Sequence, residues 1–333
     1  MRELRNSYLS IFGWGVFLAS ALSLGSCSSD ETIEAIQGEA ITFGNAFVEN
    51  STRAAEDPSY NNTNKLISQF NVWGTVTGNT DNTINVFNGA SVTRGDKAYG
   101  EAWTCDQTQY WIPDATYKFM AIAHGTVASS DANKMPLTIS YTADGETDLL
   151  LGEITSNGIK TVTTDGAAVP EIGVTEDKVV NFTMNHLLSK VVFTFVNTDA
   201  DIALKVKEIK LTGTSTSGTY TIATGKWNDT DTNYELGFGN EVTIAKGGNG
   251  TSELERLVIP GTYTNLGITF KVNDEGNVGE EQSITATITG DQTFVAGQSY
   301  NITANIKSGM KEIIFNVTSA AWGETVDDEI NIQ

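Results

Sequence analysis

Short runs in which apolar and polar residues alternate recur along most of the chain, and they constrain its fold more than any other feature. One run places Tyr117, Phe119, Ala121 and Ala123 on a single face, because successive side chains of a β-strand point to opposite sides. Similar runs lie at residues 70–76, 180–184, 266–272, 284–288, 300–306 and 313–317. Beyond the first 27 residues no stretch has the period of an amphipathic helix. The pattern predicts an all-β protein.

Turn-forming sequences separate these runs. Asp144-Gly145, Asn157-Gly158, Asp165-Gly166 and the glycine-rich loop at residues 247–250 are typical of the ends of β-hairpins. Many short strands at this spacing predict β-sandwiches.

The chain length and one apolar segment suggest two domains. A chain of 333 residues is long enough for two domains of ordinary size. Residues 187–195 are apolar on both faces beyond Lys190, as in a central strand, and a loop-rich stretch at 155–176 precedes them. We therefore predict an N-terminal sandwich at 54–183 and a C-terminal sandwich at 184–333.

The first 26 residues predict a signal peptide. Arg2 and Arg5 give a basic start, and the apolar stretch at 8–24 is shorter than the roughly 20 residues of a membrane-spanning helix. Leu24-Gly25-Ser26-Cys27 follows and resembles a bacterial lipobox, in which the cysteine is acylated and becomes the mature N-terminus. The alternative is an ordinary cleaved signal with an incidental cysteine. Acyl chains such as palmitate on Cys27 would hold the protein to a membrane.

The cysteine count agrees with lipidation. Cys27 and Cys105 are the two cysteines of the chain, so a lipidated Cys27 leaves Cys105 alone and no disulfide is expected. Cys105 lies in a strand-like region without a nearby histidine, which favours a structural role over that of a nucleophile.

Charge and composition exclude several classes of function. The chain has 41 acidic and 20 basic residues, a net charge of -21, which argues against a nucleic-acid partner because phosphate binding needs a basic surface. It has 2 histidines, His124 and His186, and neither belongs to a recognisable catalytic or metal-ligand motif. We expect no enzymatic activity, no metal and no cofactor.

Four tryptophans have two interpretations. Trp73, Trp103, Trp111 and Trp227 could stack on sugars at the surface, or they could fill the core of a sandwich. The core interpretation is favoured, because aromatic rings in alternating runs usually face inward.

Several segments, by their order and spacing, together resemble the fimbrillins of Bacteroides-type bacteria, the subunits of type V pili. The most specific is Phe182–Val191 (FTMNHLLSKV), which is similar to the signature of that family's domain junction. The others are the lipobox at Cys27, Ile41–Phe43, Ser51–Ala54, Phe70–Gly74, Trp111–Pro113 before Tyr117–Phe119, Val258–Gly261, Gly297–Tyr300 and Val317–Trp322.

The resemblance implies a fold and a function. It implies two tandem transthyretin-like β-sandwich domains after a lipoprotein signal peptide, with export to the surface of the outer membrane. It also implies trimming by an arginine-specific protease and strand exchange with other pilin subunits, in fimbriae that serve adhesion to a host or bacterial receptor and biofilm formation. Ser28–Glu34 resembles a surface-export signal of such lipoproteins. The short acidic tail after Trp322 leaves open a stalk, anchor or tip position.

Two other classes of function remain as alternatives. A surface glycan-binding lipoprotein that does not polymerise would share the signal peptide and the β-architecture, and would present exposed aromatic rings. A surface hydrolase would need a catalytic constellation that no motif in the sequence supplies.

Residues 27–53 are expected to form a removable leader. Ser51–Ala54 precedes a polar stretch at 55–64, where a protease could reach the backbone between Arg53 and Ala54. The alternative is that Arg53 is an exposed arginine in an ordinary loop.

The leader and the C-terminal tail each contain a candidate strand for exchange. Ile41, Phe43 and Phe47 share one face of the leader and predict a strand that fills a groove in its own subunit. In the tail, residues 324–333, one face carries Val326, Ile330 and Ile332 with Asp328 in line. This tail is the candidate donor strand, added to a neighbouring subunit by β-augmentation. The alternative is that it forms an edge strand of the second domain.

Overall fold

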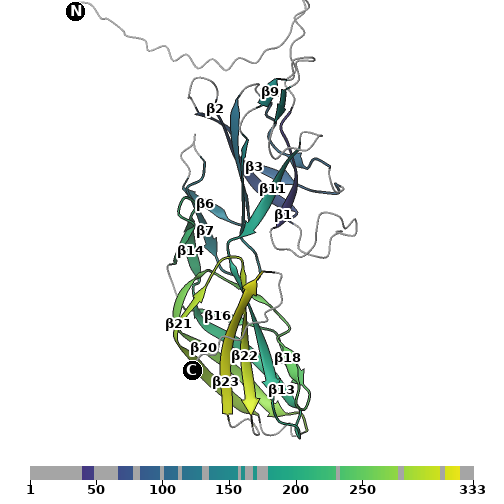
Figure 1. Ribbon diagram of the computed structural model, residues 1–333, viewed down its shortest axis with the longest axis vertical. Helices are drawn as coiled ribbons and strands as arrows, with labels where there is room; N and C mark the ends of the chain where they lie inside the picture. Colours follow the sequence, from purple (N-terminus) through teal and green to yellow (C-terminus); the bar gives the residue numbers. More distant parts are fainter. Residues whose placement is uncertain are drawn as a thin grey trace, which may run out of the picture. The chain divides into compact units, whose positions relative to one another are not determined.

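The computed structural model confirms the prediction of an all-β protein (Figure 1). It describes residues 40–48, 67–77, 83–97, 101–111, 115–129, 135–156, 159–161, 168–170, 179–229, 233–276, 281–307 and 312–322. These residues form strands joined by turns, without an α-helix. Accordingly, this part of the chain offers no helix of the length and apolar character that crossing a membrane requires.

The first half of the described chain is built on a seven-stranded sheet. Its strands, in spatial order, are β1 (Thr42–Val48), β11 (Val179–His186), β8 (Leu150–Ser156), β5 (Thr116–Ala123), β2 (Gln69–Thr77), β3 (Thr83–Thr93) and β4 (Thr104–Cys105). One face of the sheet encloses an aromatic core that includes Phe43, Phe70, Phe87, Phe119 and Phe182. This core follows from the predicted alternation, because the inward positions of β5 and β2 are the apolar ones.

The second half contains two sheets packed face to face. The first has the order β18 (Asn249–Thr251), β12 (Ser189–Asn197), β22 (Gln298–Lys307) and β23 (Glu312–Ala321), with β19 (Arg256–Val258) also paired to β12. The second has the order β16 (Tyr234–Gly237), β13 (Leu204–Thr214), β20 (Gly261–Asp274) and β21 (Gln282–Phe294), with β17 (Glu241–Ile244) paired to β13. Side chains from both sheets share one hydrophobic core, so this half is a β-sandwich.

β12 is the central strand of its sheet, as its sequence predicts. Val191, Phe193 and Phe195 are fully buried in the sandwich core. The strand pairs in parallel with β22 on one side and antiparallel with β18 and β19 on the other.

Two smaller sheets complete the fold. The first combines β6 (Thr126–Ser129) and β7 (Thr138–Thr142) with β14 (Ser217–Thr221) and β15 (Lys226–Asp229), which come from the other half of the sequence. The second consists of β9 (Ile159–Thr161) and β10 (Ala168–Pro170). The predicted boundary near residue 183 lies inside β11, and the division into domains stays a prediction.

Candidate functional site

β1 comes from the segment that the sequence predicts to be removable. It runs parallel to β11, with Phe43 opposite Val180 and Ala46 opposite Phe182, and the two strands are neighbours in Figure 1. The other neighbouring strands of the described seven-stranded sheet are antiparallel. β1 is thus the last strand in the order of this sheet, and no hairpin connects it to β11.

Ile41 and Phe43, which are two positions apart on this segment, fill the aromatic core. Ile41 is 3% exposed and Phe43 is fully buried. The Phe43 ring lies edge-on to Phe87 and Phe119, with centroids 5.1 and 5.7 Å away. It stacks on Phe182 at 6.1 Å. Burial of each such side chain contributes about 1.5–3 kcal/mol, and removal of β1 would leave an apolar groove in their place.

The other edge of β1 is also hydrogen-bonded. The backbone N–H of Trp103 donates to the carbonyl of Phe43 at 2.7 Å, and that of Ile41 donates to the carbonyl of Gln109 at 2.8 Å. Ala40 and Tyr110 form an isolated antiparallel bridge. β1 therefore lies between β11 and the segment 101–111 that carries β4. Its loss would expose unpaired backbone groups on both neighbours.

Most of the predicted site residues lie outside the described part of the chain, and their roles stay predictions. Phe47 belongs to β1 and pairs with Thr183, but its side chain is outside the described set. The residues that are not described at all are Cys27, Arg53, Ala54, Val326, Ile330 and Ile332.

The two histidines have different surroundings. His124 is exposed and has a φ of 65° in the turn after β5. His186 ends β11, and its Nδ1 donates a hydrogen bond to Oδ2 of Asp148 at 2.5 Å. Sequence analysis missed this pair, because the two residues are 38 positions apart and no local pattern joins them. Within the described ranges, no three His, Cys, Asp or Glu side chains are grouped to hold a metal ion.

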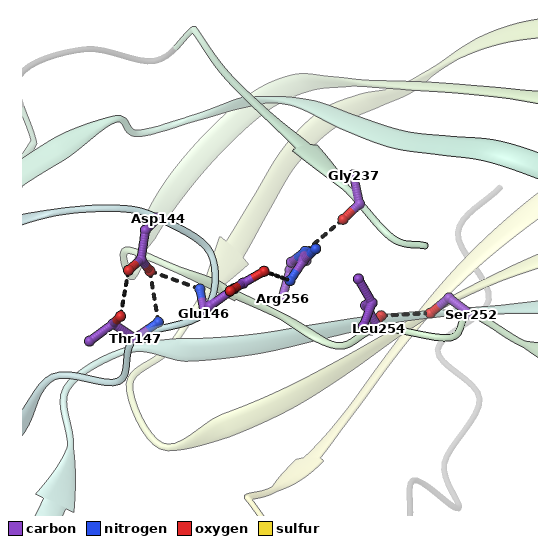
Figure 2. Close-up of polar contacts among 7 residues, drawn as sticks. All are labelled: Asp144, Glu146, Thr147, Gly237, Ser252, Leu254 and Arg256. Carbon is purple, nitrogen blue, oxygen red and sulfur yellow. Dashed lines mark hydrogen bonds and ion pairs between the residues drawn. The ribbon is translucent and has the colours of Figure 1, made fainter. Parts of the chain in front are cut away.

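A polar network, also missed from the sequence, fixes the loop after β7 to the C-terminal sandwich (Figure 2). Arg256 donates from Nη1 to Oε1 of Glu146 at 2.7 Å and from Nε to the carbonyl of Gly237 at 2.6 Å. Asp144 accepts hydrogen bonds from the backbone of Glu146 at 2.8 Å and from the backbone and hydroxyl of Thr147. Burial alone would raise the pKa of Asp144, but these bonds outweigh it and hold the pKa below its usual value.

The four tryptophans considered as sugar platforms lie in or against the core. Trp73, Trp103 and Trp111 are 8%, 6% and 3% exposed. Trp227 is half-buried, packs on two tyrosines, and donates from Nε1 to the carbonyl of Leu187 at 3.0 Å. Among the described residues, Tyr110 is the one strongly exposed aromatic side chain. The core interpretation accounts for all four tryptophans.

A shallow groove of about 470 Å³ lies at one side of the C-terminal sandwich. It is lined by residues 289–294 of β21, by Tyr300, and by residues 317–319 of β23. Asp291 is the single carboxylate of this lining, and its Oδ1 accepts a hydrogen bond from Thr264. This lining therefore lacks the pair of carboxylates that general acid–base hydrolysis uses.

Two solved structures of known proteins resemble this fold. The chain is similar in fold to a fimbrial protein from Bacteroides vulgatus, at 15% identity and a TM-score of 0.53, over 76% of this chain and 92% of that one. It is also similar to a candidate cell adhesion protein from Bacteroides ovatus, at 14% identity and a TM-score of 0.50, over 88% and 99% of the two chains. No curated protein matches the sequence.

A family model agrees with the resemblance seen in the sequence. The model of the fimbrillin-like proteins matches residues 52–322, which is most of the chain and includes the strands from β2 to β23. The chain belongs to the fimbrillin-like family.

Proposed function

We propose that this chain is a structural subunit of a surface pilus, assembled by strand exchange after proteolysis, and that the pilus serves adhesion and biofilm formation. Family membership supports association with other pilin subunits and a fimbrial location on the cell surface. It also favours a structural role over a catalytic one. The observation that carries the proposal is the position of β1, whose buried Phe43 comes from the segment upstream of Arg53.

Cleavage after Arg53 would change how β1 is held. In the intact chain β1 is covalently joined to the sandwich, and after cleavage only its side-chain packing and its backbone hydrogen bonds retain it. Its departure would open the apolar groove and two unpaired strand edges, which together accept an extended segment from another subunit. An arginine-specific protease would thus start assembly without any other energy source.

The C-terminal tail is the proposed donor. Val326, Ile330 and Ile332 on one face would take the place of the apolar side chains of β1. Each aliphatic side chain contributes about 1.5–3 kcal/mol when buried. These side chains and the backbone hydrogen bonds of an added strand together offset the cost of ordering the tail.

Lipid on Cys27 would act before this exchange. Acyl chains would hold the unassembled subunit at the outer membrane. Because Cys27 lies upstream of Arg53, the same cleavage would separate the subunit from its anchor. Replacement of Cys27 by Ala should abolish labelling with a fatty-acid analogue, and equal labelling of both proteins would exclude lipidation at this site.

The donor role is tested by deleting residues 324–333. The wild type and the truncated chain are both treated with an arginine-specific protease and inspected by electron microscopy. We expect filaments from the wild type and folded monomers from the truncated chain. Filaments from the truncated chain would show that the tail is not the donor. Trimmed monomers should also fail to bind a glycan array, which tests the rival class of function.

A further inference from the structure

Two of the segments that carry the family resemblance, 182–191 and 317–322, meet at a single side chain. Trp322 stacks on the imidazole of His186, with ring centroids 3.9 Å apart and planes 7° from parallel. Nζ of Lys190 lies 5.5 Å from the centroid of the Trp322 ring. Trp322 is 9% exposed, although it directly precedes the C-terminal tail. Trp322 belongs to a buried hydrophobic cluster that is separate from the sandwich core and from the groove under β1. Its contacts with His186 and Lys190 add to that packing.

Each contact of Trp322 is itself fixed. The carboxylate of Asp148 accepts a hydrogen bond from Nδ1 of His186 at 2.5 Å, which orients the imidazole. Nζ of Lys190 also pairs with Oε2 of Glu255 at 3.2 Å. The backbone N–H of Trp322 donates to the carbonyl of Gly297 at 2.9 Å. The indole is therefore held by an aromatic stack and a cation at once, and a cation over an indole is the strongest arrangement of its kind.

Strand β11 connects this arrangement to the candidate groove. Residues 179–184 of β11 pair with β1, and His186 ends the same strand. One strand of 8 residues thus lines the site where a donor would enter and also holds the residue from which this subunit's own tail departs.

We propose that Trp322 is a positioning residue for assembly, held by His186 and Lys190 so that the C-terminal tail leaves the subunit from a fixed point on β11. This inference rests on the proposed role of the tail as donor strand. A donor strand whose first residue is fixed has less orientational freedom to lose on docking. It therefore binds faster and more tightly than a donor strand whose first residue is mobile.

The first test measures the mobility of the start of the tail, at position 324, in the unassembled subunit. A nitroxide label is placed at Glu324→Cys in the full chain, with Cys27→Ser and Cys105→Ser. We expect a restricted electron paramagnetic resonance spectrum in this protein and in Trp322→Phe, and rapid motion in Trp322→Ala. Trp227→Ala is the matched control and should keep the restricted spectrum, because it truncates an aromatic ring that packs on the same hydrophobic cluster and does not hold the tail. Equal mobility in the parent protein and in Trp322→Ala would overturn the proposal.

The second test measures assembly after cleavage at Arg53. We expect Trp322→Ala to slow filament growth about tenfold, and Trp322→Phe to stay within about twofold of the wild type. If Trp322→Ala does not fold, Lys190→Met decides, since it removes the cation and keeps the aliphatic chain. Normal growth by a folded Lys190→Met with a freely moving label would contradict the proposal. Failure of the wild type to assemble would instead overturn the function proposed above. The label spectra would still decide whether Trp322 fixes the start of the tail.

Discussion

Arg256 shows at the scale of one residue how the described halves of the chain are joined. Its side chain is 14% exposed and binds both a carboxylate and a backbone carbonyl. Lys210 forms a similar pair with Glu235 at 2.7 Å, but the two side chains are 43% and 54% exposed. Glu146 is 69% exposed, so solvent screens its pair with Arg256 as well. The bond from the mostly buried guanidinium to the carbonyl of Gly237 is what distinguishes Arg256 from Lys210.

This contrast gives a prediction for stability. Arg256→Ala should lower the free energy of unfolding by about 1–3 kcal/mol, because it removes two hydrogen bonds of a mostly buried charge. Lys210→Ala is the matched control and should change it by less than about 1 kcal/mol. Urea unfolding followed by circular dichroism measures both. Equal effects of the two substitutions would show that the Arg256 network does not stabilise the fold.

Tyr141 gives a prediction for pH. Burial, with added repulsion from Asp144 and Asp148, raises the pKa of the Tyr141 phenol above its ordinary value of 10.0. A group whose pKa is higher in the folded than in the unfolded state stabilises the fold at low pH, and this contribution is lost as the pH rises through the folded pKa. We expect the free energy of unfolding of the wild type to fall as the pH rises above about 10, and to fall less steeply in Tyr141→Phe.

The control for this prediction is Tyr110→Phe, because the side chain of Tyr110 is 55% exposed. It should retain the slope of the wild type. Tyr141→Phe should also be less stable by about 1 kcal/mol near neutral pH, since the hydroxyl donates to the carbonyl of Thr147 at 2.5 Å. Identical slopes for the wild type and Tyr141→Phe would contradict the assigned cause.

Residue-scale contacts mark the limit of what the sequence predicts. The alternation in the leader places Ile41 and Phe43 on one face, and both side chains are buried. In contrast, Arg256 and Glu146 are 110 positions apart, and no local period identifies such partners. They meet because the fold places the loop after β7 beside β19, which depends on the topology and not on short-range pattern.

At the scale of elements, β1 packs closely against β11 because Gly44 has no side chain. A Cβ at this position would lie 2.4 Å from Cγ1 of Val179 and 2.8 Å from Oδ1 of Asn181. Both distances are shorter than van der Waals contact, so a larger residue would push β1 away from its partner. Gly44 therefore sets how firmly the candidate removable strand is held.

We predict that Gly44→Val releases the leader more readily. After cleavage at Arg53, loss of residues 27–53 from the sandwich should be about tenfold faster than in the wild type, as expected for a loss of about 1.4 kcal/mol. Size-exclusion chromatography with mass spectrometry measures the release. Gly237→Val is the control, because a Cβ there meets no atom within 4 Å. Unchanged release from Gly44→Val would show that β1 does not limit the opening of the groove.

The positions of the strands were more predictable than their pairing. Alternation located β5, β12 and β22, because the period of a strand is local to it. The parallel pairs β1–β11 and β12–β22 were not predicted, and neither was the sheet that joins β7 to β14. Alternation shows which face of a strand is buried, but it does not specify the neighbouring strand.

At the scale of the whole molecule, the charge of the chain predicts how salt affects assembly. The full chain has a net charge of -21, of which residues 1–53 carry -3, so the cleaved subunits keep a net charge of -18 and repel one another. The range of this repulsion falls from about 30 Å at 0.01 M salt to about 10 Å at 0.1 M. Filament growth by the cleaved protein should therefore accelerate over this range, as light scattering would measure. Slower growth at higher salt would instead indicate that attraction between opposite charges drives the contact.

Assembly by strand exchange requires that a segment of another subunit replaces β1. The most direct measurement is the composition of filaments formed after treatment with an arginine-specific protease, with Arg53→Ala as the control. Mass spectrometry should find chains that begin at Ala54 and no residues 27–53, while Arg53→Ala remains monomeric. Filaments that retain residues 27–53, or equal filaments from Arg53→Ala, would contradict strand exchange as the basis of assembly.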